Sequence, residues 1–128
     1  MKNYLLLFAI LIFATATLSA YPGGVSGYTK KTNNLGCSCH TSTITSTVSV
    51  LIKGPATLQP SQVGDYTVTV SGGAGTAAGV DIAASGGALV NSDANLKVKS
   101  SELTQPSKKV YSGGQYVFKF KLTAPATT

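Results

Sequence analysis

Two segments of the sequence, residues 65–71 and residues 115–122, alternate apolar and polar residues with a period of two. This alternation is typical of β-strands that bury one face and expose the other. In the later segment, Tyr116, Phe118 and Phe120 occupy one set of alternate positions. We therefore expect these aromatic residues to lie in a hydrophobic core rather than to form a binding surface.

Shorter apolar runs surround these two segments and are separated by glycine and proline. They predict strands over residues 48–53, 78–85, 88–90 and 96–98, with a brief pairing at 109–111. Residues 102–114 are otherwise expected to be mostly loop. No stretch after residue 20 shows the 3.6-residue apolar period of an amphipathic helix.

This pattern predicts an all-β fold, namely an immunoglobulin-like antiparallel β-sandwich over residues 44–128. The sequence stops at Thr128, where such a sandwich usually adds a strand, so we expect either a sandwich that lacks its last strand or a fragment of a longer chain. An exposed sheet edge would follow, and the unpaired backbone groups of such an edge favour self-association through strand pairing.

The N-terminal residues have the composition of a targeting segment. A lysine at position 2 is followed by an almost wholly apolar run over residues 4–18 and by the small residues Ser19 and Ala20. This order is typical of a secretory signal peptide, and cleavage is expected after Ala20. Residues 21–43 have no strand or helix period and are predicted to form an irregular leader. No later run is apolar enough to span a membrane, so the mature chain is expected to be secreted or held at the cell surface.

Charge and composition disfavour two classes of function. After residue 20 the chain has nine lysines, four acids and no arginine, and its formal charge is +5. Arginine is the usual residue for phosphates and base edges, so no nucleic-acid partner is expected. The acids are scattered and have no histidine placed for general-base chemistry, so the protein is not expected to be an enzyme. Asp81 is expected to face solvent, and Glu102 is a candidate to orient His40.

The segment Gly36-Cys37-Ser38-Cys39-His40 holds both cysteines and the single histidine of the chain. Three chemistries suit it. In covalent haem attachment, two cysteines form thioethers and the adjacent histidine binds iron, usually with two residues between the cysteines rather than one. An extended one-residue spacer still lets the two Cα atoms lie about 7 Å apart, so the geometry permits attachment. A copper or zinc site and a strained, labile disulfide between Cys37 and Cys39 are the other two.

Further segments carry a resemblance to a known family. They are Gly27-Tyr28-Thr29, Gly54-Pro55, Leu58-Gln59-Pro60, residues 66–70, Gly72-Gly73, residues 79–85, residues 101–104, Phe118 and Thr123-Ala124-Pro125. Together with the cysteine cluster, they resemble the choice-of-anchor V domain family of secreted bacterial surface proteins, which is loosely related to Reeler-type sandwiches. The resemblance covers about residues 27–125, and the cluster and residues 79–85 are its most specific parts.

The resemblance implies an exported sandwich with an anchoring segment after the domain, and a cysteine-histidine element that serves as a c-type haem site. Relatives often have Glu-Leu-Thr-His where this chain has Glu-Leu-Thr followed by Gln105. If that histidine is the second axial ligand, Gln105 leaves the sixth iron position open or weakly filled.

The leading hypothesis is therefore an exported c-type haem protein with an electron-transfer or redox role. Cys37 and Cys39 would anchor haem c, and His40 would be the proximal iron ligand. The partners would be a redox partner or neighbouring surface proteins. The alternative is a non-enzymatic adhesion or structural module, in which the same cluster is a disulfide or a Cu or Zn site.

Overall fold

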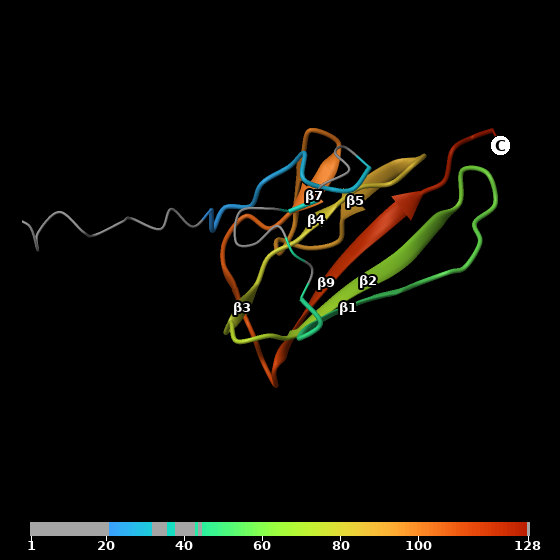
Figure 1. The fold of residues 1–128 in the computed structure, drawn as a ribbon. Helices are drawn as coiled ribbons and strands as arrows, with labels where there is room; N and C mark the ends of the chain where they lie inside the picture. Colours follow the sequence, from blue (N-terminus) through green and yellow to red (C-terminus); the bar gives the residue numbers. More distant parts are fainter. Residues whose placement is uncertain (1–20, 32–35, 38–42, 44, 128) are drawn as a thin grey trace, which may run out of the picture.

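The computed structural model describes residues 21–31, 36–37, 43 and 45–127, whose arrangement is shown in Figure 1. Within these ranges all regular secondary structure is β-strand, which confirms the predicted all-β class. The strands are β1 (Val48–Lys53), β2 (Val63–Gly72), β3 (Ala77–Ala78), β4 (Asp81–Ile82), β5 (Ala88–Asn91), β6 (Lys97–Lys99), β7 (Glu102–Thr104), β8 (Lys109–Val110) and β9 (Gln115–Thr123). The described ranges hold no helix suited to crossing a membrane. The expected signal peptide, residues 1–20, lies outside them.

The larger sheet is antiparallel and has the strand order β1-β2-β9-β5. Its two long central strands, β2 and β9, are the two segments whose sequences alternate. Val68 lies opposite Phe118, and Tyr66 lies opposite Phe120. Directly opposed residues of an antiparallel pair share a face, so the apolar positions of both strands form one surface. On this surface the rings of Tyr66 and Phe120 stack with their centroids 5.5 Å apart.

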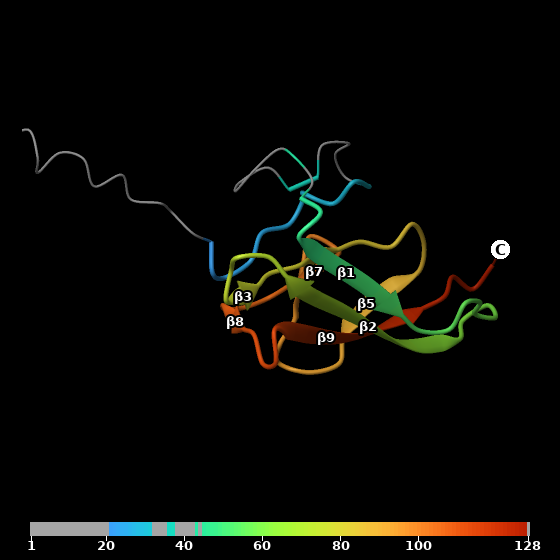
Figure 2. The ribbon, with the colours of Figure 1, turned by 60° about the horizontal axis from the view of Figure 1, so that its bottom comes forward.

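A smaller antiparallel sheet, in the order β4-β7-β6, lies across the core from β2 and β9 (Figures 1 and 2). Phe118 of β9 and Leu103 of β7 have no exposed surface and belong to one buried cluster with Leu96. Truncation of a fully buried phenylalanine typically costs about 3–5 kcal/mol, so Phe118 is a main support of the fold. Phe120 is also buried and Tyr116 is half-buried against the same cluster, which confirms that these aromatic residues form core.

The single strand expected over residues 78–85 is split in two, and that prediction is wrong. β3 ends one residue before Gly79, and β4 begins at Asp81. Between the two strands, the N–H of Val80 donates to Oε1 of Gln105 at 2.8 Å. A Cβ on Gly79 would lie 2.7 Å from Nε2 of the same side chain. Between β3 and β4, the backbone is therefore bonded to the buried side chain of Gln105 and not to a neighbouring strand.

The expectation of loop over residues 102–114 is also wrong at its start. Residues 102–104 form β7, the central strand of the smaller sheet, and all three are buried. Two of them are polar, which made the segment look like surface loop. The hydroxyl of Thr104 donates to the carbonyl of Val80 at 2.8 Å, so its polar group is satisfied inside the protein.

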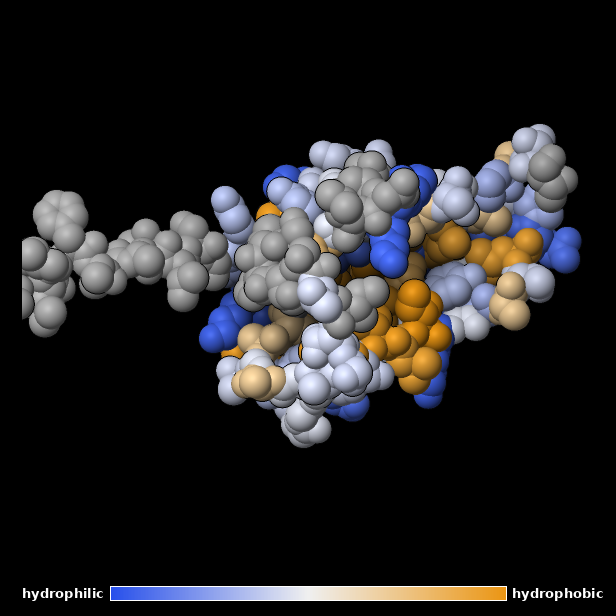
Figure 3. Space-filling model, in the orientation of Figure 1, coloured by the Kyte–Doolittle hydropathy of each residue, from blue (hydrophilic) through white to orange (hydrophobic). Residues whose placement is uncertain are grey.

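Strand β1 forms an edge of the larger sheet that the smaller sheet does not cover. Val50 lies opposite Val70 and Ile52 lies opposite Val68, so both point to the same side as the core. Val50 is nevertheless 62% exposed and Ile52 is 63% exposed. Figure 3 shows apolar side chains gathered on this side of the molecule. The structure therefore has an exposed apolar edge at β1, whereas the last strand β9 lies inside the sheet between β2 and β5.

Candidate functional site

The leader residues 21–31 lie beside β4 and β7 (Figure 1). Two carboxylates hold this segment. The N–H of Gly27 donates to Oε2 of Glu102, and the hydroxyl of Thr29 donates to Oε1 of the same residue at 2.9 Å. The N–H of Tyr28 donates to Oδ2 of Asp81 at 3.0 Å. Hydrogen bonds to ionised groups are stronger than those between neutral groups, so three consecutive leader residues are fixed to the smaller sheet.

The leader also makes close backbone contact with β7 at Gly24. This glycine has a φ of +73°, in the left-handed region that favours glycine. A Cβ at this position would clash with the side chain of Thr104 and with the carbonyl of Gln105. The sequence Gly23-Gly24 therefore allows the leader to approach the buried strand without an intervening side chain.

The expectation that Asp81 faces solvent is wrong. Oδ1 of Asp81 is buried and has no hydrogen-bond partner among the described residues, while Oδ2 accepts from Tyr28. Burial is the largest cause that raises the pKa of Asp81, and the neighbouring carboxylate of Glu102 adds to it; against the opposing effects of the Tyr28 N–H and Lys99, the pKa reaches about 6. A proton on Asp81 reduces its repulsion with Glu102, so the two acids behave as an interacting pair.

Glu102 is 5% exposed and accepts hydrogen bonds from Gly27 and Thr29. It was a candidate to orient His40. Because His40 lies outside the described residues, that contact stays a prediction. What the structure does show is that Glu102 positions the leader that runs toward the cysteine cluster.

Cys37 is exposed, and its thiol lies 3.9 Å from the carbonyl oxygen of Tyr28. The N–H of Tyr28 is hydrogen-bonded to Asp81 of β4, so Tyr28 links the Cys37 thiol to this strand. The remaining residues of the cluster, Ser38, Cys39 and His40, lie outside the described ranges. Among the described residues, no group of three His, Cys, Asp or Glu side chains is arranged to hold a metal ion.

Gln105 stands where the resembling family often has histidine. The residue is buried, and its carboxamide oxygen accepts hydrogen bonds from the N–H of Val80 at 2.8 Å and from the hydroxyl of Thr104 at 3.3 Å. Its side chain is therefore committed to the backbone before β4. In this chain the position has a structural role that the sequence did not suggest.

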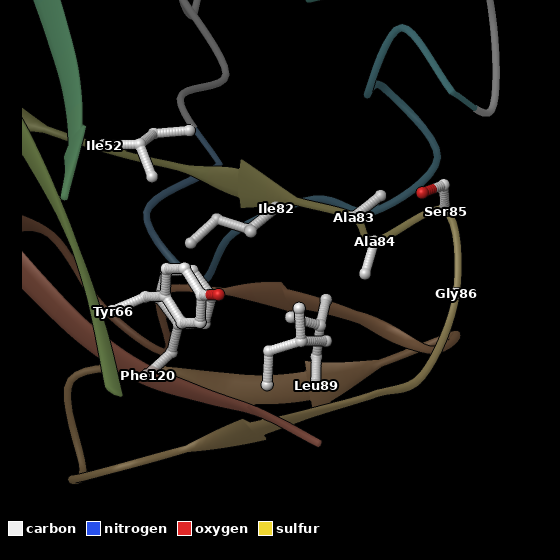
Figure 4. Close-up of a pocket in the computed structure, with 10 residues that line it drawn as sticks. Ile52, Tyr66, Ile82, Ala83, Ala84, Ser85, Gly86, Leu89 and Phe120 are labelled. Atoms are coloured by element: carbon white, nitrogen blue, oxygen red, sulfur yellow. The ribbon is translucent and has the colours of Figure 1, made fainter. Parts of the chain in front are cut away.

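An apolar pocket of about 280 Å³ opens between the two sheets (Figure 4). The larger sheet contributes Ile52, Leu89 and the stacked rings of Tyr66 and Phe120. The other wall is Ile82 of β4 together with Ala84 in the segment that follows this strand. The phenol oxygen of Tyr66 donates to the carbonyl of Pro55 at 3.0 Å, so it is already satisfied. The small residues of segment 83–86 leave the space open, where larger side chains would fill it.

The described part of the chain thus brings together Cys37, the leader, Asp81 and Glu102, and it sets the pocket beside Ile82. Cys37 was predicted from the sequence as a site residue, whereas the hydrogen bonds between the two acids and the leader were not. The only signal was the position of two acids in β-rich stretches with few charges. No family model, no curated protein and no solved structure matches this chain.

Proposed function

We propose that this chain is an exported c-type haem protein of the cell surface with an electron-transfer or redox role. Cys37 and Cys39 hold haem c through thioether bonds, and His40 is the proximal iron ligand. The observation that carries the proposal is the grouping of both cysteines and the single histidine within four residues, 37–40. No catalytic residue is assigned.

The described residues are compatible with such attachment. A thioether forms when a thiol adds across a porphyrin vinyl group: a sulfur–carbon bond forms, the thiol hydrogen moves to the other vinyl carbon, and no oxidant is needed. Cys37 is exposed, as access to the attachment machinery requires. The leader contacts of Tyr28 and Thr29 hold this cysteine beside the smaller sheet.

Bound iron would supply one-electron chemistry, and its coordination depends on what this chain offers. His40 is the single histidine, and the single methionine is Met1. After removal of residues 1–20, the chain can supply neither a His/His nor a His/Met pair. The sixth ligand is therefore water, a lysine, a tyrosine, the new N-terminal amine or a group from another subunit.

The finer fold assignment and the location belong to the same proposal. The four-stranded and three-stranded antiparallel sheets, with the short β3-β8 pair beside them, share one core and support an immunoglobulin-like sandwich of the choice-of-anchor V type. The apolar run of residues 4–18 supports cleavage after Ala20 and export. A redox partner or a neighbouring surface protein would be the physiological contact.

The test is the intact mass and visible absorption of the protein exported from a host that has c-type attachment machinery. We expect a mass gain of one haem group that survives acid extraction. The Cys37→Ala/Cys39→Ala double variant should show no mass gain. In His40→Ala a smaller fraction of the molecules should carry haem, with an altered absorption spectrum. Ser38→Ala is the matched control and should behave as the wild type does. A colourless wild-type protein without added mass would reject the proposal.

A second function is favoured by the exposed apolar edge at β1. In this account the chain is a non-enzymatic adhesion or structural module that pairs through β1, and the cluster is a disulfide or a Cu or Zn site. The same mass measurement separates the two accounts. A Cys37–Cys39 disulfide gives a mass lower than that of the reduced protein by two hydrogens, and a bound metal gives the mass of that metal under non-denaturing conditions.

A further inference from the structure

Strand β1 is an edge of the larger sheet, where it pairs with β2 on one side only (Figure 1). Edge strands pair readily with other strands, and proteins usually protect them with proline, with lysine or by keeping them short. Among the described edge strands, β5 has four residues and β6 carries Lys97 and Lys99. β1 has six residues, all exposed, and its single charge lies at its end, at Lys53. It is therefore the least protected of these edges.

The hydrogen bonds at the start of β1 show which of its backbone groups point outward. The N–H of Gly73 donates to the carbonyl of Thr47 at 2.8 Å, so residue 47 belongs to a hydrogen-bonded pair with the β2 side. Hydrogen-bonded and non-hydrogen-bonded pairs alternate along an antiparallel ladder. The odd-numbered residues of β1 therefore bond to β2, and the backbone groups that point away from the sheet belong to Val48, Val50 and Ile52. In the part of the chain that the structure describes, these outward groups have no backbone partner.

A second copy of the chain can offer the same strand in antiparallel orientation across a two-fold axis. Directly opposed residues then share a face, so the axis can pass at Val50, at Leu51 or at Ile52. An axis at Leu51 places the two leucines opposite each other and Val50 opposite Ile52, so apolar side chains meet apolar side chains. It also places Ser49 opposite Lys53. An axis at Val50 would put Leu51 opposite Ser49, and an axis at Ile52 would put Leu51 opposite Lys53.

Charge favours the same arrangement. After residue 20 the nine lysines and four acids give each copy a formal charge of +5, so two copies repel each other unless they meet at a neutral surface. With the axis at Leu51, the two Lys53 residues are four positions apart along the paired strands, about 14 Å at about 3.4 Å per residue. This separation exceeds the Debye length of about 8 Å at physiological ionic strength. A parallel pairing would instead place the two Lys53 side chains next to each other.

We propose that two copies of this chain associate through β1, antiparallel and with the two-fold axis at Leu51, so that their larger sheets join into one. This inference rests on the second function considered above, pairing through β1, for which it names the partner and the register. It does not depend on haem. The strand supplies six residues per copy, fewer than the roughly 20–30 residues a side of a stable interface. The dimer therefore forms reversibly and depends on concentration.

The first test is sedimentation velocity of the full exported protein at increasing concentration, with a reductant present so that no disulfide between two copies contributes. We expect the wild type to shift from monomer to dimer as its concentration rises to the millimolar range. Val50→Pro should stay monomeric, because proline removes an outward N–H but no bond to β2. Val50→Ala is the matched control. It keeps the N–H and should still dimerise.

Leu51 tests the register independently of the proline variant. Leu51→Lys and Leu51→Glu each place two like charges opposite each other at the axis, so each variant alone should be monomeric. An equimolar mixture of the two should restore a dimer with one copy of each, which native mass spectrometry identifies. Val98→Glu is the control for a charge on an exposed apolar residue elsewhere, because Val98 lies on β6 and is 54% exposed. It should dimerise as the wild type does.

Three results would overturn the inference. In the first, the wild type stays monomeric up to millimolar concentration, and the second function then needs a different partner. In the second, Val50→Pro dimerises as strongly as Val50→Ala, so the backbone of β1 is not the contact. In the third, the wild type dimerises but the mixture of Leu51→Lys and Leu51→Glu stays monomeric, so the axis does not pass at Leu51. None of these results bears on haem attachment, which is read from the mass of the exported protein.

Discussion

The hydroxyl of Thr29 donates a hydrogen bond to Oε1 of Glu102 at 2.9 Å, although the two residues are 73 positions apart in the sequence. The other carboxylate oxygen of Glu102 accepts from the N–H of Gly27. Because Glu102 is buried at the start of β7, the leader is part of the hydrogen-bond system of the smaller sheet. Residues 27–29, upstream of the cysteine cluster, therefore have a defined place in the fold.

Replacement of Glu102 with alanine should release the leader from β7. The substitution removes the acceptors of Gly27 and Thr29, and a buried polar group left unsatisfied costs about 1–3 kcal/mol. We expect faster amide hydrogen exchange at residues 27–29 and a lower free energy of unfolding in urea.

The matched control for this change is Asp65→Ala. Asp65 pairs with Lys121, but the aspartate side chain is 77% exposed, and exposed ion pairs contribute about 0–1 kcal/mol. The control should leave hydrogen exchange in the leader unchanged. If Glu102→Ala and Asp65→Ala lowered the free energy of unfolding equally and left hydrogen exchange in the leader the same, a specific role for Glu102 would be contradicted.

The Asp81–Glu102 pair should make attachment of the leader dependent on pH. The pKa of Asp81 is raised in the folded protein from 3.8 to about 6, first by burial. A raised pKa means that the folded state binds the proton more tightly than the unfolded state does. The contribution of Asp81 to stability is therefore fully present below pH 3.8 and is lost as the pH rises through about 6.

Comparison of wild type with Asp81→Asn isolates this effect, since every other titrating group is shared. Asparagine retains an acceptor for the Tyr28 N–H and cannot ionise. We expect Asp81→Asn to gain Tm relative to wild type as the pH rises from about 4 to about 7. A difference in Tm that stays constant across this range would show that Asp81 does not titrate in it.

The long strands were predictable from sequence because each has its own period. Residues 65–71 alternate strictly and residues 115–122 alternate except at Val117, and a period of two fixes both the strand and its buried face. The short strands β4 and β7 have two and three residues, too few to show a period. The polar residues Glu102 and Thr104 looked like loop because the groups that satisfy them lie far away in the sequence.

The candidate site shows the same division. The chemistry of Cys37 was visible because cysteine and histidine are rare in this chain, so their grouping stands out. The exposed apolar edge at Val50 and Ile52 was not visible, because the same apolar residues fit a buried strand equally well. Their exposure depends on how far the smaller sheet extends across the larger one, which is a tertiary property.

Replacement of Gln105 with alanine should lower the free energy of unfolding, because a buried hydrogen bond is lost. It leaves the N–H of Val80 without its acceptor, which costs about 1–3 kcal/mol. Gln62→Ala is the matched control, because the Gln62 side chain caps the N–H of Gln59 on the exposed surface. Urea unfolding gives the free energy of unfolding of both variants. If Gln62→Ala lowered it as much as Gln105→Ala, the structural role of the buried Gln105 side chain would be contradicted.

The inner face of β1 should bind apolar probes and promote association. Val50 and Ile52 are exposed, and exposed apolar patches are sites of self-association. We expect the wild type to bind the dye ANS and to associate as its concentration rises. Ile52→Glu should reduce both effects. Equal dye binding by the wild type and by Ile52→Glu would contradict an exposed apolar edge at β1.

The coordination of the iron gives the final prediction. Since His40 is the single histidine and Met1 lies in the expected signal peptide, the dilute loaded monomer should have a weakly filled sixth position. We expect a high-spin spectrum in the reduced protein, conversion to a low-spin spectrum on addition of imidazole, and rapid binding of carbon monoxide. His40→Ala removes the proximal ligand of the iron. In this variant, added imidazole should therefore bind the iron on both faces of the haem. A low-spin spectrum of the bis-histidine or histidine–methionine type in the untreated monomer would contradict this prediction, whereas a low-spin spectrum that appears only at high concentration would assign the sixth ligand to a second copy of the chain.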